Sequence, residues 1–98
     1  MKITVKGRNI DITPAINEFV QDKFIKKLDR QSEGVKEIQV TLSVAKPESK
    51  AEAVIEVVGD TFHTEASVTE GDVYAAVDLL LDKVTRIIIK HKEKTQNS

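Results

Sequence analysis

Apolar and polar residues alternate with a period of two in four stretches of the chain, which is the pattern of half-buried β-strands. The first strand is short and ends at Gly7, the clearest one covers residues 37–44, and two more follow after a polar turn at residues 46–50. The dipeptide Gly59-Asp60 predicts a tight hairpin turn between these last two strands. The positions expected to face the core are Ile3, Val5, Ile38, Val40, Leu42, Val44, Ala51, Ala53, Ile55, Val57, Phe62, Thr64, Ala66 and Val68.

Two longer segments have the period of an α-helix. The first begins at Thr13-Pro14, with Thr13 as N-cap and Pro14 at the first helical position, and is expected to end near Asp29. The second covers residues 72–94, with Thr69 or Asp72 as its cap. The apolar stripe of the first helix is Ile16, Val20, Phe24 and Leu28, and that of the second is Val73, Val77, Leu80, Leu81, Val84, Ile87 and Ile88.

The resulting order, β-α-β-β-β-α, predicts an α+β fold. A right-handed crossover makes the first two strands parallel, and the two hairpins make the following strands antiparallel. Both helices then run in the direction opposite to the first strand and cover one face of a four-stranded sheet with their apolar stripes. The sequence therefore predicts two parallel helices packed on one side of the sheet.

Basic residues gather in the C-terminal half of each predicted helix. Acidic residues near a helix start and basic residues near its end complement the helix dipole, which accounts for part of this pattern. Because the two helices are parallel, both basic halves are expected at the same end of the molecule, in one patch with few acids among them. Asp78 and Asp82 are expected on the solvent side, away from this patch, whereas the position of Asp72 near the basic stripe has no evident reason. The patch comprises Lys23, Lys26, Lys27, Arg30, Lys83, Arg86, Lys90 and Lys94, and such a patch predicts binding to nucleic-acid phosphates.

Length and composition limit the alternatives. The 98 residues suit a single domain spanning 1–98, with residues 95–98 as a frayed tail. The absence of cysteine excludes disulfides, thiolate catalysis and cysteine-ligated zinc. The chain shows no signal sequence, and no apolar run approaches the ~20 residues of a membrane span, so we expect a soluble cytoplasmic protein.

Residues that could carry catalysis are few and scattered. His63 is expected on the sheet face away from the helices and His91 on the apolar side of the last helix, and no nucleophile accompanies either one. The carboxylates do not converge on a metal site, and the glycines form no phosphate-binding loop. We therefore expect no enzyme, no metal and no cofactor. Tyr74, the only tyrosine, either packs over the helix start or stacks on a base or ribose.

Three motifs resemble those of the ribosome hibernation promoting factor family, which includes the ribosome-associated inhibitor called protein Y. The motifs are GRNIDITPAINEFVQDKFIKKL near the N-terminus, V-x-G-x-x-x-H-x-x-A in the middle, and DVYAAVDLLLDKVTRIIIKHKEK near the C-terminus. The resemblance covers residues 1–94. It implies a fold like that of double-stranded RNA-binding domains and a protein that binds the small ribosomal subunit in the tRNA and mRNA channel, at the rRNA of the decoding region, blocking initiation and storing inactive ribosomes in stationary phase. The positions that the resemblance assigns to rRNA binding are Lys23, Lys26, Lys27, Arg30, Lys83, Arg86, Lys90, Lys92 and Lys94, with Tyr74 as a further candidate.

The short segment after Lys94 resembles the short form of this family, which has no C-terminal dimerisation domain. That form implies promotion of ribosome dimers together with a separate ribosome modulation factor, and neither a membrane nor DNA as partner. Two alternatives remain open from the residues: a general double-stranded RNA-binding module and a protein-binding modulator of transcription.

Overall fold

The elements follow the predicted order along the chain. The computed structural model describes the backbone of residues 1–96 and the side chains of residues 1–93. The elements are β1 (Lys2–Gly7), α1 (Pro14–Leu28), a short 3-10 helix η1 (Asp29–Gln31), β2 (Val35–Ala45), β3 (Glu48–Val57), β4 (Asp60–Thr69) and α2 (Val73–Gln96). Thr95 and Gln96, predicted to belong to a frayed tail, are part of α2, whereas residues 97–98 lie outside the described residues.

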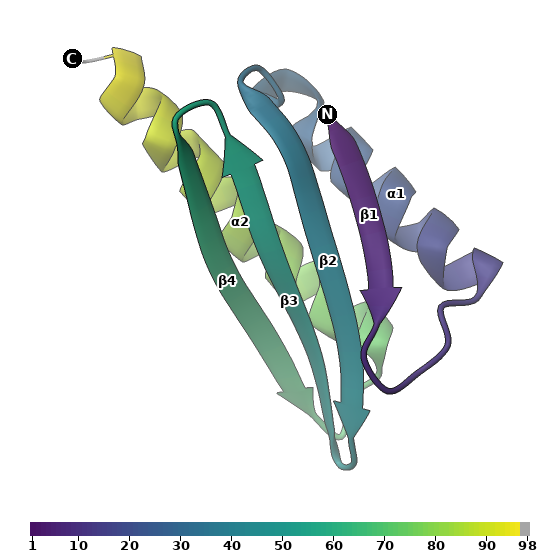
Figure 1. Ribbon diagram of the computed structural model, residues 1–98. Coiled ribbons are helices and arrows are strands. Elements are labelled where there is room, and N and C mark those ends of the chain that lie inside the picture. The colour runs from purple at the N-terminus through teal and green to yellow at the C-terminus, as the bar shows by residue number, and fades with distance from the viewer. Residues whose placement is uncertain (97–98) are drawn as a thin grey trace.

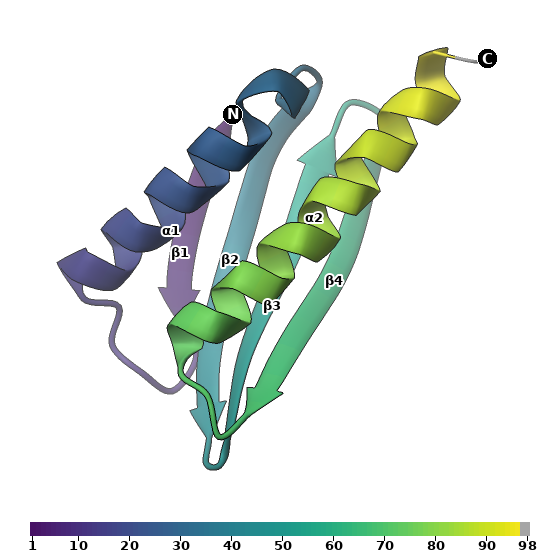
Figure 2. The same cartoon turned by 180° about the vertical axis from the view of Figure 1, so that it is seen from behind.

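The four strands form one sheet in the order β1-β2-β3-β4 (Figure 1). β1 pairs in parallel with β2, placing Ile3 opposite Ile38, and the two hairpins pair β2, β3 and β4 in antiparallel fashion. Both helices lie on the same face of the sheet and run in the same direction, as Figure 2 shows. The predicted fold class and helix arrangement are confirmed.

The core lies between the sheet and the two helices. The helix α1 packs over β1, and α2 crosses β3 and β4. Val20, Phe24 and Leu28 of α1 are fully buried, and α2 contributes Ala76 and the predicted stripe except Ile87, which is partly buried. The buried apolar positions of the strands are Ile3, Val35, Ile38, Val40, Leu42, Ala51, Ala53, Ile55, Val57 and Ala66.

Each helix begins at a residue whose side chain caps it. The Oγ1 of Thr13 accepts a hydrogen bond from the backbone N–H of Ile16 at 3.1 Å, and Oδ1 of Asp72 accepts one from the N–H of Ala75 at 3.0 Å. Such caps satisfy backbone donors that have no partner within the helix. The cap of α2 is therefore Asp72 and not Thr69, which ends β4, and capping supplies the reason for Asp72 near the basic stripe.

The first hairpin is tighter than the sequence predicts, and the turn of the second is shifted by one residue. The strand β3 starts at Glu48, inside the expected polar turn, because Ala45 pairs with Glu48 and the buried hydroxyl of Ser49 donates to the carbonyl of Gly71 at 2.8 Å. The second turn consists of Val58 and Gly59 instead of Gly59 and Asp60. Gly59, the second residue of this turn, has a φ of 85°, a conformation that glycine adopts without steric cost.

Candidate nucleic-acid interface

The outer surface of the helix pair contains an open groove of about 510 Å³ between α1 and α2. Its two sides carry opposite charges, with cations on the α1 side and carboxylates on the α2 side. Leu81 is buried at its base. The groove is lined by Lys23, Lys26, Lys27, Asp78, Leu81 and Asp82. We call this the interhelical groove.

A second group of cations lies on the side of α2 that faces β4. The Nζ of Lys83 donates a hydrogen bond to the carbonyl oxygen of Glu65 in β4 at 2.8 Å. Lys90 borders a hollow that also includes Phe62 and His91. Arg86, three residues after Lys83, is exposed. We call Lys83, Arg86 and Lys90 the β4 flank.

The prediction of one continuous basic patch is wrong. Lys83 reaches β4 while the lysines of α1 line the interhelical groove, so the body of α2 separates the two groups. The carboxylates of Asp78 and Asp82 are exposed, as predicted, but they line the same groove as the α1 lysines instead of lying away from them. The periodicity of α2 defines angles within that helix, whereas its rotation relative to α1 depends on packing between the two.

Lys92 and Arg30 connect the end of α1 with the basic end of α2. The Nζ of Lys92 donates to the backbone carbonyl of Arg30 in η1 at 3.4 Å, across a sequence separation of 62 residues. The guanidinium of Arg30 is exposed near this contact. The side chain of Lys94, the last predicted contact, lies outside the described residues.

Tyr74 packs against α1. Its ring meets that of Phe19 edge to face, with centroids 4.8 Å apart and an interplanar angle of 80°, and Nζ of Lys23 lies 5.5 Å from the Phe19 centroid. Such aromatic contacts stabilise a pair by about 0.5–1.5 kcal/mol beyond their burial. Tyr74 therefore contributes to the packing of α2 against α1, and 36% of its surface remains exposed. Its contact with RNA stays a prediction.

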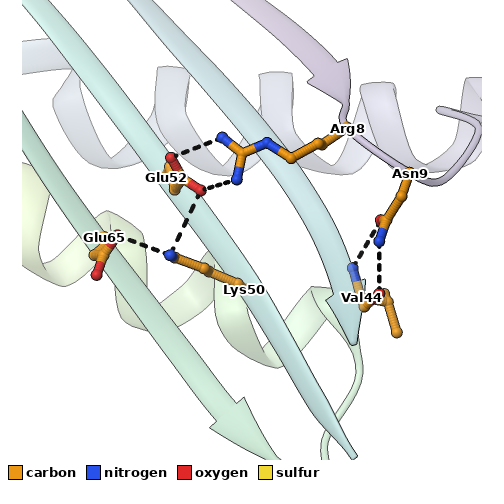
Figure 3. Close-up of polar contacts among 6 residues, drawn as sticks. All are labelled: Arg8, Asn9, Val44, Lys50, Glu52 and Glu65. Carbon is orange, nitrogen blue, oxygen red and sulfur yellow. Dashed lines mark hydrogen bonds and ion pairs between the residues drawn. The ribbon is translucent and has the colours of Figure 1, made fainter. Parts of the chain in front are cut away.

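The opposite, open face of the sheet carries a charge network that the sequence analysis did not predict (Figure 3). Arg8 contacts both carboxylate oxygens of Glu52, at 2.8 and 3.2 Å, and Lys50 lies 3.7 Å from Glu52 and 3.1 Å from Glu65. The hydrogen bond from Lys50 to Glu65 raises the pKa of Lys50 above its ordinary value. The outward register positions of β3 and β4 could have indicated the pairing of Lys50, but the partner of Arg8 depends on a loop.

That loop is held against β2. The backbone N–H of Arg8 donates to the carbonyl of Leu42 at 2.9 Å. The side chain of Asn9 bonds to both backbone groups of Val44, at 2.8 and 3.0 Å, as Figure 3 shows. These contacts place Arg8 over the open face of the sheet, within reach of Glu52.

The two faces of the molecule therefore differ in how their cations are used. On the open face, Arg8 and Lys50 are paired with carboxylates, whereas the exposed Lys2 and Lys6 form no ion pair within 4.0 Å in the described part of the chain. Among the described side chains, the lysines of the interhelical groove and the cations of the β4 flank form no ion pair within 4.0 Å. Unpaired cations are available to phosphates, and the helix side gathers six of them in the interhelical groove and on the β4 flank, so it is the better candidate for a nucleic-acid interface.

The histidines occupy the predicted faces. His63 is exposed on the open face, beside Glu65. The ring of His91 packs against Phe62 with centroids 5.5 Å apart, in the packing role that its position on the helix indicates. Within the described residues, no group of three or more His, Cys, Asp or Glu side chains could hold a metal ion. Neither described helix combines the length and hydropathy that a membrane span needs.

The β-α-β-β-β-α fold and the cationic helix side define a candidate RNA-binding domain. Residues 3–96 match the family described as Sigma 54 modulation protein / S30EA ribosomal protein, and the chain belongs to this family. Proteins of this family bind ribosomes and are not enzymes.

Two relatives are each named ribosome hibernation promoting factor. The protein from Azotobacter vinelandii is 38% identical over 94 residues, covering 96% of this chain and 85% of the relative. The protein from Escherichia coli K12 is 39% identical over 95 residues, covering 96% of both chains. These relatives confirm the resemblance to the hibernation promoting factor family.

Two solved structures share the fold. A ribosomal subunit interface protein from Coxiella burnetii superposes with a TM-score of 0.83 at 25% identity, covering 95% of this chain and 99% of that one. The N-terminal domain of protein Y from Thermus thermophilus superposes with a TM-score of 0.75 at 29% identity, covering 93% and 99% of the two chains.

Proposed function

We propose that this protein is a cytoplasmic ribosome hibernation factor that binds the small ribosomal subunit in the tRNA and mRNA channel, at the rRNA of the decoding region. Occupation of that channel inhibits translation and keeps ribosomes inactive in stationary phase. The observation that carries the proposal is the set of unpaired cations on the helix side of a chain belonging to a ribosome-associated family. The names of the relatives support the link to hibernation.

The proposed rRNA contacts fall into two groups on opposite sides of α2. Cations on both sides of α2 can engage two separate runs of phosphates, because the helix itself stands between them. Phosphate contacts of this kind hold a protein in register and carry most of the salt-dependent affinity. The proposed rRNA-binding residues are Lys23, Lys26, Lys27, Arg30, Lys83, Arg86, Lys90, Lys92 and Lys94, with Tyr74 at the edge of the surface.

The resemblance to the hibernation promoting factor family also implies a role in ribosome dimers. We infer that the bound protein promotes or stabilises inactive ribosome dimers, acting on the same ribosome as a separate ribosome modulation factor. Sucrose-gradient profiles of stationary-phase ribosomes, with and without the protein, test this step. An unchanged dimer fraction would restrict the function to inhibition of single ribosomes.

Charge reversal on the β4 flank tests the binding site. The triple variant K83E, R86E and K90E should no longer co-sediment with small subunits. A matched control reverses Lys2, Lys6 and Lys46, three exposed cations of the open sheet face and of the β2–β3 turn. Far-UV circular dichroism establishes that both variants fold. Retained binding of the first variant, or equal loss in both, would overturn the assigned site.

A general double-stranded RNA-binding module has the same helix-pair-on-sheet architecture. Such modules recognise duplex shape and not sequence. Gel shifts with arbitrary RNA duplexes separate the two functions: affinity equal to that for small subunits would favour the general module, and much weaker affinity supports the hibernation factor.

A protein-binding modulator of transcription is favoured by one observation, the words "Sigma 54 modulation protein" in the description of the family. Pull-down from a lysate treated with ribonuclease tests it. Recovery of a sigma factor without ribosomal components would support this role over ribosome binding.

A further inference from the structure

The interhelical groove has two chemically different walls. Lys23, Lys26 and Lys27 line the α1 side, while Asp78 and Asp82 line the α2 side. The two aspartates are four residues apart, so their backbones lie about 6 Å apart along one face of α2. A ligand in this groove meets ammonium groups on one side and carboxylates on the other.

Neither wall neutralises the other. Within the described residues, Asp78 and Asp82 accept no hydrogen bond, and no ion pair within 4.0 Å joins them to the three lysines. On the open sheet face, by contrast, Lys50 is paired with two carboxylates. The carboxylates of the groove are also not helix caps, since Asp72 has that role. Both walls are therefore available to a third partner.

Exposed carboxylates are unfavourable on a surface that binds phosphates. At physiological salt, charges separated by less than about 8 Å are incompletely screened, so an RNA backbone held by the lysines is repelled by Asp78 and Asp82. RNA can offset this repulsion only with its own donors, which are the amino and imino groups of the bases and the 2′-hydroxyls. Carboxylates accept hydrogen bonds from base amino groups, as in contacts to the N4 of cytosine. Unpaired nucleotides expose these base edges fully.

We propose that Asp78 and Asp82 read the N–H groups of unpaired rRNA bases whose phosphates are bound by the lysines of α1. The inference rests on the proposed function and deepens it, because it makes the groove a specificity site and not only a phosphate site. The lysines supply affinity for any RNA. The aspartates make that affinity selective, since the Watson–Crick N–H groups of a duplex are already paired and only its 2′-hydroxyls remain as readily accessible donors for the carboxylates.

The paired measurement uses the double variant D78N and D82N. Its affinity for small ribosomal subunits should fall by about tenfold or more, the loss of one good base contact, while its affinity for an arbitrary RNA duplex should rise or stay the same. The control variant E48Q and E56Q removes the same charge from exposed positions on the open face of β3. If the aspartates only repel RNA, removing their charge would tighten binding to both RNAs, and that result would overturn the inference.

Chemical probing of the bound rRNA distinguishes bases from ribosomal proteins as the partner. Wild-type protein should protect the Watson–Crick edges of a few unpaired bases, and the double variant should lose these protections while backbone protections elsewhere persist. Weaker binding with unchanged base reactivity would assign the carboxylates to a protein and overturn the inference. Failure of the wild-type protein to bind small subunits would instead refute the proposed function itself.

Discussion

Neutralising the three lysines of the interhelical groove should change the salt dependence of ribosome binding. The variant K23Q, K26Q and K27Q keeps the length and polarity of the side chains but removes three charges from one wall. All three positions are exposed, and none carries an ion pair among the described side chains, so the fold loses little. The effect should therefore fall on binding.

The magnitude follows from the number of ammonium groups. Each phosphate contact contributes about 0.7–0.9 to the slope of log affinity against log salt, so three contacts contribute about 2.1–2.7. Between about 50 and 200 mM salt, wild-type affinity should therefore fall about 20–40-fold more than that of the variant. Fluorescence anisotropy of labelled protein titrated with small subunits, at four or five salt concentrations, gives both slopes.

The control is the variant K2Q, K6Q and K46Q, which removes the same charge from exposed positions outside the groove. Its slope should match that of the wild type. Parallel slopes for the groove variant and the wild type would show that these lysines do not contact phosphates, and the groove would then not be part of the interface.

Three further predictions concern the fold. D72A removes the side chain that caps α2 and should lower the free energy of unfolding by about 1 kcal/mol in urea titration, whereas D72N should lower it by only a few tenths of a kcal/mol. Equal losses in the two variants would mean that the hydrogen bond of the cap does not stabilise the helix. G7A adds a β-carbon that would lie 1.9 Å from the carbonyl oxygen of Ile10. Thermal unfolding should therefore show that the free energy of unfolding falls by about 1–3 kcal/mol because of overpacking. An unchanged melting temperature would contradict this prediction. The hydroxyl of Thr4 donates to Glu37 at 2.8 Å and lowers the pKa of that carboxyl below 4.5. The stability that this hydrogen bond contributes is present above pH 4.5 and is lost as the pH falls through the pKa of Glu37 in the folded protein. T4V should therefore be less stable than wild type at pH 7, and the difference in stability should narrow in acid. A difference that stays constant down to about pH 2 would assign the effect to packing.

Local patterns in the sequence determined the elements of this protein and their buried faces. Apolar residues at every second position indicate a strand, and apolar residues at about every fourth position indicate a helical stripe. Both patterns involve only residues that are close together in the sequence. The inward positions of β3 and the stripe of α1 follow directly from them, as does the parallel course of the two helices, which strand polarity requires. The concentration of cations in the second half of each helix was also visible without coordinates.

Only the tertiary structure decided how the charged residues are grouped. The packing of the buried face of α2 against the sheet and α1 sets the rotation of this helix, with Lys83 toward β4 and Asp78 and Asp82 in the groove. The pairing of Arg8 with Glu52 likewise joins residues 44 positions apart through a loop. A periodicity gives the angle of a side chain within its own helix, but the angle between two helices comes from contacts that no local pattern encodes. The sequence alone therefore determined which charges this protein has on each element, and packing decided which of them face one another.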